Sequence, residues 1–190
     1  MDSGEWDHHG QVWLEQGTKA WETGQHEEAT QFFNRIVDRY PNRPEGYNKL
    51  GVIYAEMGQR EYAEKYFLYA LSKETLHVPA LTNLGNVYLE RGEIDEAIKH
   101  YTLALQTDPE YPPAHRNLAI AYRRLGRIGP SVRHLKRSQW LETRERVSAD
   151  QPLSGDTRTQ PFWQVIFRRP GIWLVLAALL ILWVIGWGIH

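Results

Sequence analysis

The chain has 190 residues and a formal net charge of −1 at pH 7. Its hydrophobic fraction of 42% and charged fraction of 24% are ordinary for a globular protein, which excludes a wholly disordered or collagen-like chain. The near balance of 22 basic and 23 acidic side chains gives no overall signature of a nucleic-acid binder, and the absence of cysteine excludes disulfides, thiolate metal sites and cysteine nucleophiles.

Charge and hydrophobicity are distributed unevenly along the chain. Residues 1–40 carry three basic and eight acidic side chains, whereas residues 112–150 carry nine basic and three acidic ones. Residues 172–189 contain no charged and no ordinary polar side chain. The chain is therefore acidic at its N-terminal end and basic next to a strongly apolar C-terminal segment.

Residues 1–9 are acidic and lack an apolar stretch. A secretory signal needs an apolar core and an organellar transit peptide is poor in acidic residues, so we expect a simple N-terminal extension here. His8 and His9 are adjacent within it, and two neighbouring histidines near a chain end are expected to be solvated and not to hold a metal.

From residue 10 onward, residues of the same kind recur every 34 positions, which indicates an internal repeat. One position is glycine in all four copies, and other positions hold small, alanine-like or large apolar residues in turn. These sets are Gly24, Gly58, Gly92 and Gly126; Gly17, Gly51, Gly85 and Ala119; Ala29, Ala63, Ala97 and Ser131; Phe33, Phe67, Tyr101 and Leu135. The period divides residues 10–147 into four units, 10–43, 44–77, 78–111 and 112–147.

Each unit contains two amphipathic helical stretches separated by a glycine turn. The small residue of the first stretch lets the second helix approach closely, and stacked hairpins bury what one hairpin cannot bury alone. The pattern resembles the tetratricopeptide repeat family, and the third copy, ALTNLGNVYLERGEIDEAIKHYTLALQTDP, follows the family pattern almost throughout. The resemblance implies an all-α solenoid of helical hairpins that binds other proteins.

The resemblance also implies a candidate binding surface. In this family the first helix of each unit lines a concave face that receives an extended peptide or a helix. By register, the lining here includes Leu14, Thr18, Trp21, Glu45, Asn48, Val52, Thr82, Asn86, Leu89, Arg116, Ile120 and Arg123. Some members clamp the C-terminal carboxylate of a chaperone with lysines and asparagines. Asn48, Asn83, Asn86 and Arg116 resemble that clamp only in part, because its lysines are missing.

The fourth unit is strongly basic. Its second helix is expected to extend to about residue 147, with Trp140 capping the stack. A basic membrane-proximal face is formed by Arg124, Arg127, Arg133, Lys136 and Arg137. This face is open to three interpretations: attraction to anionic lipid, docking of an acidic partner loop, or a solvated end of the stack. No interleaved aromatic platform supports RNA binding.

Three segments follow the repeats. Residues 148–160 have the composition of a flexible linker. Residues 161–170 combine aromatic and aliphatic side chains with two arginines, which is typical of a short interfacial segment, although an extended end of the linker is an equal alternative. Residues 171–190 are predicted to form a single transmembrane helix that acts as a tail anchor.

The length and flanks of this apolar segment support the membrane prediction. Its eighteen uncharged residues would span roughly 27 Å as a helix, close to the hydrocarbon thickness of a bilayer. Arg168 and Arg169 precede it and favour an orientation with the repeats on the cytoplasmic or equivalent side. Trp173 and Trp187 suit the two interfaces, while Trp183 lies inside the span and suits contact with another protein helix. A buried core helix is the disfavoured alternative, because the segment is apolar all round.

The sequence contains no constellation of residues that would support catalysis, no phosphate-binding loop and no metal-ligand set. We therefore expect a non-enzymatic, cofactor-free, membrane-tethered scaffold that binds a partner protein through its repeats, as an accessory subunit or assembly factor of a membrane complex. The alternative is a tail-anchored adaptor or receptor that recruits soluble partners of the chaperone, fission or import type. The expected partners are protein and membrane lipid, with neither nucleic acid nor a small-molecule substrate.

Overall fold

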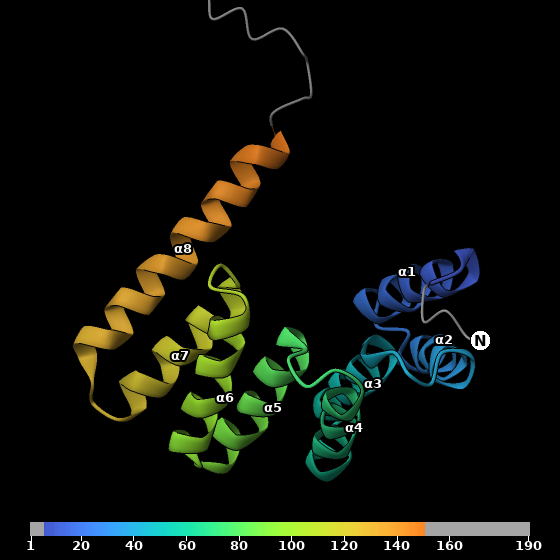
Figure 1. Ribbon diagram of the computed structural model, residues 1–190, viewed down its shortest axis with the longest axis horizontal. Helices are drawn as coiled ribbons and strands as arrows, with labels where there is room; N and C mark the ends of the chain where they lie inside the picture. The colour runs from blue at the N-terminus through green and yellow to red at the C-terminus, as the bar shows by residue number, and fades with distance from the viewer. Residues whose placement is uncertain (1–5, 151–190) are drawn as a thin grey trace, which may run out of the picture. The chain divides into compact units, whose positions relative to one another are not determined.

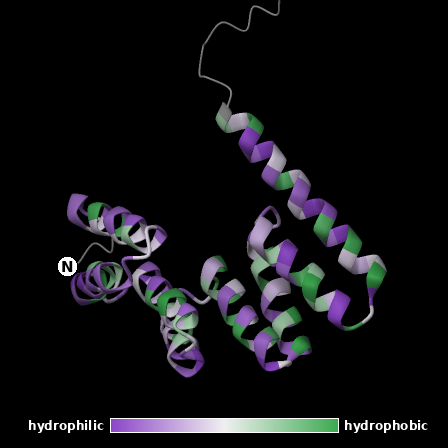
Figure 2. Ribbon diagram, turned by 180° about the vertical axis from the view of Figure 1, so that it is seen from behind, coloured by the Kyte–Doolittle hydropathy of each residue, from purple (hydrophilic) through white to green (hydrophobic). Residues whose placement is uncertain are grey.

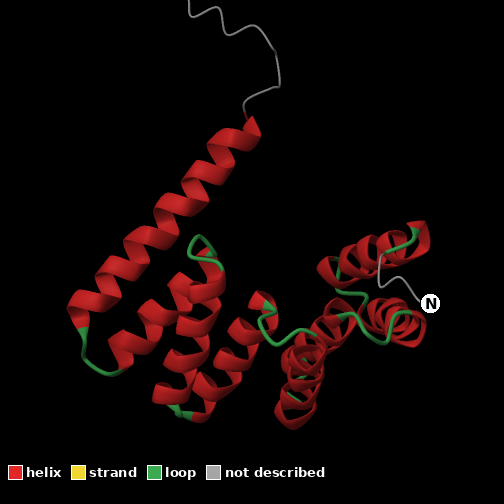
Figure 3. Cartoon of the chain, in the orientation of Figure 1, coloured by secondary structure: helices red, strands yellow, loops and turns green. Residues whose placement is uncertain are grey.

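The computed structural model describes residues 6–150, which form eight helices and no strand within that range (Figures 1 and 3). The four helical hairpins lie in chain order, and each packs on the next through its second helix. The helices are α1 (His8–Glu22), α2 (His26–Arg39), α3 (Pro44–Glu56), α4 (Arg60–Lys73), α5 (Val78–Arg91), α6 (Ile94–Thr107), α7 (Pro112–Arg124) and α8 (Ile128–Asp150).

Proline and glycine mark the ends of the first helix of most hairpins. α3, α5 and α7 each carry proline in the first turn, where the missing N–H costs nothing. α5 ends at Gly92, whose φ of 83° lies in the left-handed region that glycine adopts without strain. α1 begins differently, because the Asp7 side chain accepts a hydrogen bond from the Gly10 amide at 3.0 Å.

The core of each of the first three hairpins is a close contact between a glycine and an aromatic ring. A Cβ atom on Gly51 would lie 2.5 Å from Cε1 of Phe67, and one on Gly85 would lie 2.6 Å from Cε1 of Tyr101. Both rings are almost fully buried. The predicted role of the small residue in helix approach is therefore confirmed, and the contact explains why glycine recurs at this position.

The fourth hairpin departs from this pattern. Ala119 and Leu135 replace the glycine and the aromatic residue, so this hairpin lacks the contact between a bare backbone and a ring. α8 is 23 residues long and continues to Asp150, three residues beyond the end of the repeat expected from the sequence. Glu110, in the loop before α7, pairs with Arg137 and Arg144 and so ties the long helix to the stack.

Trp140 does not cap the stack as expected. It is 50% exposed, and the guanidinium groups of Arg137 and Arg144 lie 4.5 Å and 4.9 Å from its ring centroid. Leu141, the next residue, is fully buried instead. One residue along a helix turns the side chain by about 100°, which is enough to place Trp140 outside and Leu141 inside.

Apolar and polar residues alternate along the described helices, as expected of amphipathic helices in a stack (Figure 2). Among residues 6–150, no helix combines the length and the apolar character needed to cross a bilayer. The predicted linker, interfacial segment and transmembrane helix lie outside the described residues, apart from residues 148–150, which belong to α8.

Candidate functional site

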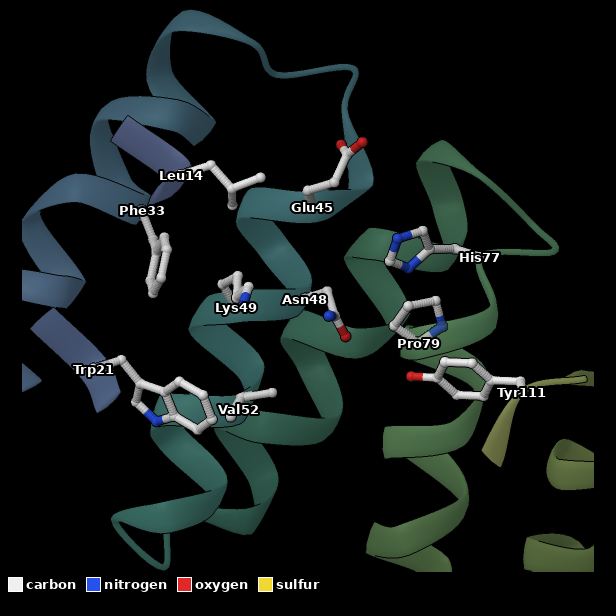
Figure 4. Close-up of a pocket in the computed structure, with 10 residues that line it drawn as sticks. All are labelled: Leu14, Trp21, Phe33, Glu45, Asn48, Lys49, Val52, His77, Pro79 and Tyr111. Atoms are coloured by element: carbon white, nitrogen blue, oxygen red, sulfur yellow. The ribbon is translucent and has the colours of Figure 1, made fainter. Parts of the chain in front are cut away.

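A groove of about 310 Å³ runs across the first helices of the hairpins (Figure 4). Asn48 and Lys49 of α3 lie in its middle, with side chains of the first hairpin on one side and of the third on the other. The lining residues are Leu14, Trp21, Phe33, Glu45, Asn48, Lys49, Val52, His77, Pro79 and Tyr111.

One wall of the groove is apolar and rigidly held. Leu14 and Trp21 of α1 pack against the first core cluster, and Val52 belongs to the neighbouring one. The Trp21 indole donates a hydrogen bond from Nε1 to Glu56 at 2.6 Å, which fixes the orientation of the ring. An apolar side chain of a ligand could therefore contact a preformed surface at little cost in side-chain entropy.

The middle of the groove carries two charged groups with unused binding capacity. The Lys49 ammonium lies 5.5 Å from the ring centroid of Trp21, and burial lowers the pKa of Lys49, an effect that the charge of Glu22 partly opposes. No carboxylate in the described part of the chain forms an ion pair with Lys49. Glu45 pairs through Oε1 with Arg43 at 3.0 Å, while its Oε2 is buried and has no hydrogen-bond partner among the described residues.

The opposite wall is supplied by the loops that precede α5 and α7. His77 caps α5 by accepting a hydrogen bond from the Ala80 amide at Nδ1, and burial lowers the pKa of His77. Because Nδ1 accepts, the ring proton lies on Nε2. The Tyr111 hydroxyl points toward Asn48, and burial raises the pKa of Tyr111. This wall adds hydrogen-bonding groups that are neutral at pH 7.

The structure places several of the sequence-predicted residues together in this groove. Leu14, Trp21, Asn48 and Val52 all line it. Thr18 lies in a neighbouring hollow of about 680 Å³, beside Leu14 and other residues of α1. These residues come from two consecutive first helices, as the register predicts.

Other residues that were predicted to line the groove are buried or hydrogen-bonded between the stacked helices. Thr82 and Leu89 are only 2% and 7% exposed, and neither lines the groove. Oδ1 of Asn86 accepts hydrogen bonds from Asn117 and from the Tyr101 hydroxyl, both at 2.7 Å. These residues occupy the same helix positions as groove residues, but here those positions pack against neighbouring helices.

The asparagines that resemble a carboxylate clamp bind one another. Asn83 donates to Oδ1 of Asn48 at 3.0 Å, as Asn117 does to Asn86. These bonds tie consecutive first helices together. The asparagines thus hold consecutive repeats together. This role explains why asparagine recurs at these positions, and it requires no bound carboxylate.

The predicted lining residues of the fourth unit do not form one common surface. Arg116 pairs with Glu142 of α8, Ile120 packs against the cluster around Tyr101, and Arg123 is exposed. On the basic face, Arg124 donates to the Leu89 carbonyl at 2.6 Å, and Arg137 pairs with Glu110 at 3.1 Å. In the described chain, no carboxylate pairs with the others, Arg127, Arg133 and Lys136. Trp173, Trp183 and Trp187 lie outside the described residues.

Sequence reasoning missed five groove residues, Phe33, Lys49, His77, Pro79 and Tyr111. Lys49 directly follows Asn48, a predicted lining residue, and that position was visible in the sequence. His77 and Tyr111 occupy equivalent places one period apart, immediately before the first helix of a repeat. That equivalence was available in the sequence as a second signal.

The histidines of the described chain outside the groove include one closely joined pair, His115 and His134. Among residues 6–150 there is no group of three or more metal-ligating side chains that could hold an ion. His115 and His134 are joined through their Nδ1 atoms at 2.9 Å, and Nε2 of His115 donates to the Pro109 carbonyl at 3.0 Å. That bond leaves Nδ1 of His115 as the acceptor, so the pair joins α7 to α8 in a fixed tautomer.

Comparison with solved structures shows the same fold in several proteins. The crystal structure of MamA has a TM-score of 0.58 at 23% identity, over 72% of this chain and 80% of that one. A thermophilic TPR protein of Thermus thermophilus gives 0.64 at 21% identity, over 70% and 75%. PilF of Pseudomonas aeruginosa gives 0.65 at 19% identity over 71% of this chain, which spans 62% of PilF.

Family comparison identifies the repeats directly. A model described as TPR repeat matches residues 85–126, and two described as tetratricopeptide repeat match residues 10–43 and 44–72, together more than half of the chain. A comparison with curated proteins gives no match. The matches at 10–43 and 44–72 correspond to the first two hairpins, and the match at 85–126 runs from within α5 to the turn after α7. Repeats of this kind are protein-interaction modules. The chain therefore belongs to the tetratricopeptide repeat family.

Proposed function

We propose that this protein is a non-enzymatic, membrane-tethered scaffold whose groove binds an extended segment of a partner protein. The observation that carries the proposal is the groove itself, which joins a rigid apolar wall to two polar groups. They are the Lys49 ammonium, which forms no ion pair in the described chain, and Oε2 of Glu45, which has no hydrogen-bond partner there. A scaffold needs such a preformed surface, and the family membership supports this use of it.

The charges in the groove favour a ligand with an acidic residue next to an apolar one. A carboxylate beside Lys49 would stabilise an ammonium that burial disfavours. A backbone N–H of an extended segment would satisfy Oε2 of Glu45, an acceptor that is costly to leave buried and unbonded. The apolar side chain would pack on Trp21. A helix would fit less well, because its backbone N–H groups are already bonded.

A library of displayed peptides, selected on the full chain in mild detergent, tests this proposal. The wild-type chain should enrich sequences with Asp or Glu beside an apolar residue, and Lys49→Glu should reverse the charge preference toward Lys or Arg. Lys65→Glu is the matched control, because Lys65 is exposed on α4 and lies over the Tyr69 ring, away from the groove. Unchanged enrichment in Lys49→Glu would refute groove binding.

The membrane part of the proposal is supported by the sequence of residues 172–189, which lacks charge, and by the basic composition of residues 112–150. Extraction of membranes with alkaline carbonate tests it: the full chain should stay with the membrane, and a chain ending at residue 150 should be released. Release of the full chain would refute the tether while leaving the scaffold proposal intact.

A tail exchange separates an accessory subunit from a tethered adaptor. A leucine-rich span of equal length in place of residues 172–189 should preserve membrane association in both cases. If the native tail packs on partner helices, this exchange and Trp183→Leu should weaken the complex, because helix association in lipid depends on close fit. Undiminished co-purification of both variants would favour the adaptor.

A further inference from the structure

The second helix of each repeat carries one face that receives the first helix of the next repeat. Four positions, 34 residues apart, allow these faces to be compared. Phe33, Phe67 and Tyr101 are 1%, 2% and 0% exposed, whereas Leu135 of α8 is 42% exposed. The difference follows in part from the stack, because a further hairpin covers each of the first three positions and none of the described residues covers the fourth.

Two more apolar residues extend this exposed surface. Ile128 and Val132 are 58% and 43% exposed, and with Leu135 they follow the i, i+4, i+7 spacing of a single helical stripe. Their equivalents one period earlier, Ile94 and Ile98, pack into the cluster between α6 and α7. We call Ile128, Val132 and Leu135 the end face. It retains the residues that hold a helix in the preceding repeat.

The basic side chains beside the end face favour a ligand with acidic side chains. Arg127 immediately precedes α8, and Arg133 and Lys136 lie on it, and none of the three pairs with a carboxylate in the described chain. At an internal junction, by contrast, Arg60 of α4 pairs with Glu90 of α5 at 3.0 Å, so charged side chains cross between stacked helices. An occupant with acidic residues beside its apolar stripe would supply the missing partners.

A second copy of this chain does not fit these requirements. Two end faces related by a two-fold axis would bring the unpaired basic side chains of both copies together. The opposite end of the stack is no better, because α1 presents exposed Gln16 and Lys19 where later first helices carry Leu50 and Ile53. Self-association therefore lacks complementary charge in one arrangement and an apolar surface in the other.

The arrangement of side chains also argues against a lipid surface. Trp140 is the side chain of α8 best suited to a bilayer interface, yet it lies about 120° around the helix from Ile128. It is held there between Arg137 and Arg144, both bonded to Glu110. A membrane-binding helix would present its aromatic and aliphatic residues on one side.

We propose that the end face docks an amphipathic helix of another protein, with an apolar stripe flanked by Asp or Glu, as a further helix on the stack. This inference rests on the proposed scaffold function but uses a surface on α8 that shares no residue with the groove. The end face would thus bind a helix, and the groove an extended segment.

Absence of cysteine in the chain makes a clean test possible. The full chain carrying Val132→Cys is placed in nanodiscs of neutral lipid, and its rate of maleimide labelling is measured with a synthetic 18-residue amphipathic helix whose leucine stripe is flanked by glutamates. We expect at least tenfold slower labelling at saturation. Leu68→Cys, on the outer face of α4 at 48% exposure, is the control and should label at an unchanged rate.

Two further arms decide between occupants. Replacing Arg133 and Lys136 with Glu in the Val132→Cys chain should abolish protection by the acidic helix and transfer it to a peptide with lysine flanks. Protection of the introduced thiol without peptide, either in discs containing phosphatidylserine or at rising protein concentration, would overturn the proposal in favour of lipid or of a second copy. Failure of the acidic helix to protect the thiol would also overturn it.

The same variants test the groove proposal independently of docking at the end face. Lys49→Glu should leave protection of the thiol in Val132→Cys unchanged, and the charge swap on α8 should leave the peptide preference of the groove unchanged. Loss of that protection in Lys49→Glu would place the synthetic helix in the groove and refute docking at the end face.

Discussion

Substitution of Gly85 tests the packing on which the whole stack depends. A Cβ atom at this position would lie 2.6 Å from Cε1 and 2.9 Å from Cδ1 of Tyr101, both well inside ordinary contact. The ring has little freedom to move, because it is fully buried and its hydroxyl donates to Oδ1 of Asn86 at 2.7 Å. Gly85→Ala must therefore displace the ring, strain α5, or weaken that hydrogen bond.

The expected size of the effect is a difference between two opposing contributions. Overpacking of a close contact costs about 1–3 kcal/mol, whereas replacing glycine by alanine inside a helix favours folding by about 0.5–1 kcal/mol. At the midpoints of these two ranges, Gly85→Ala should lower the free energy of unfolding by about 1 kcal/mol, and Gly85→Leu by more. Urea unfolding of residues 1–150, followed by circular dichroism, would measure both, since residues 1–148 form a compact unit.

The fourth repeat supplies the matched control. There the same pair of positions is occupied by Ala119 and Leu135. Gly85→Ala combined with Tyr101→Leu copies this pair into the third repeat, so the double variant should lose at least about 0.5 kcal/mol less than the sum of the single losses. Strict additivity, or a Gly85→Ala variant as stable as the wild type, would refute the account of this contact.

Three further predictions concern α8. Gly129→Ala should change the free energy of unfolding in urea by less than about 1 kcal/mol. A Cβ there would meet no atom beyond its chain neighbours closer than 3.9 Å, and the following Pro130 offsets the gain in helix propensity. Burial lowers the pKa of His134, so its contribution to stability should be complete above about pH 6.5 and lost as the pH falls. His134→Gln should flatten that fall in thermal melts. Glu110→Gln should speed hydrogen exchange in the last turns of α8, because it removes the ion pairs with Arg137 and Arg144. Hydrogen bonding to Arg144 lowers the pKa of Glu110, so acidification should have the same effect only at a pH below the ordinary pKa of a glutamate.

The repeats could be predicted because close packing leaves few choices at certain positions. Gly51 and Gly85 stand where any Cβ would enter an aromatic ring, and Ala63 and Ala97 are fully buried between helices. Such positions repeat with the fold and are visible as a period. The same reasoning predicts eight helices, since each glycine at a positive φ separates two of them.

The groove could be predicted only in part, because its lining depends on how the hairpins are stacked. Asn48 and Thr82 occupy the same place in consecutive repeats and both are buried, yet only Asn48 lines the groove. The Thr82 hydroxyl is bonded to the Val78 carbonyl at 2.9 Å. Periodicity within one helix cannot distinguish them. The difference arises because the third repeat meets the groove through the residues before and at the start of α5, His77 and Pro79.

The position of the two proposed binding surfaces has a consequence for how a scaffold of this kind would work. The groove lies on α1, α3 and the loops before α5 and α7, whereas the end face lies on α8, beyond the last repeat junction. They share no residue, and the glycine–aromatic contacts between them are too tightly packed to deform gradually. Occupation of one surface should therefore change the affinity of the other little unless the two partners touch. Two ligands bound without coupling are held at a high effective concentration relative to each other, and this alone suffices to bring together the parts of a complex.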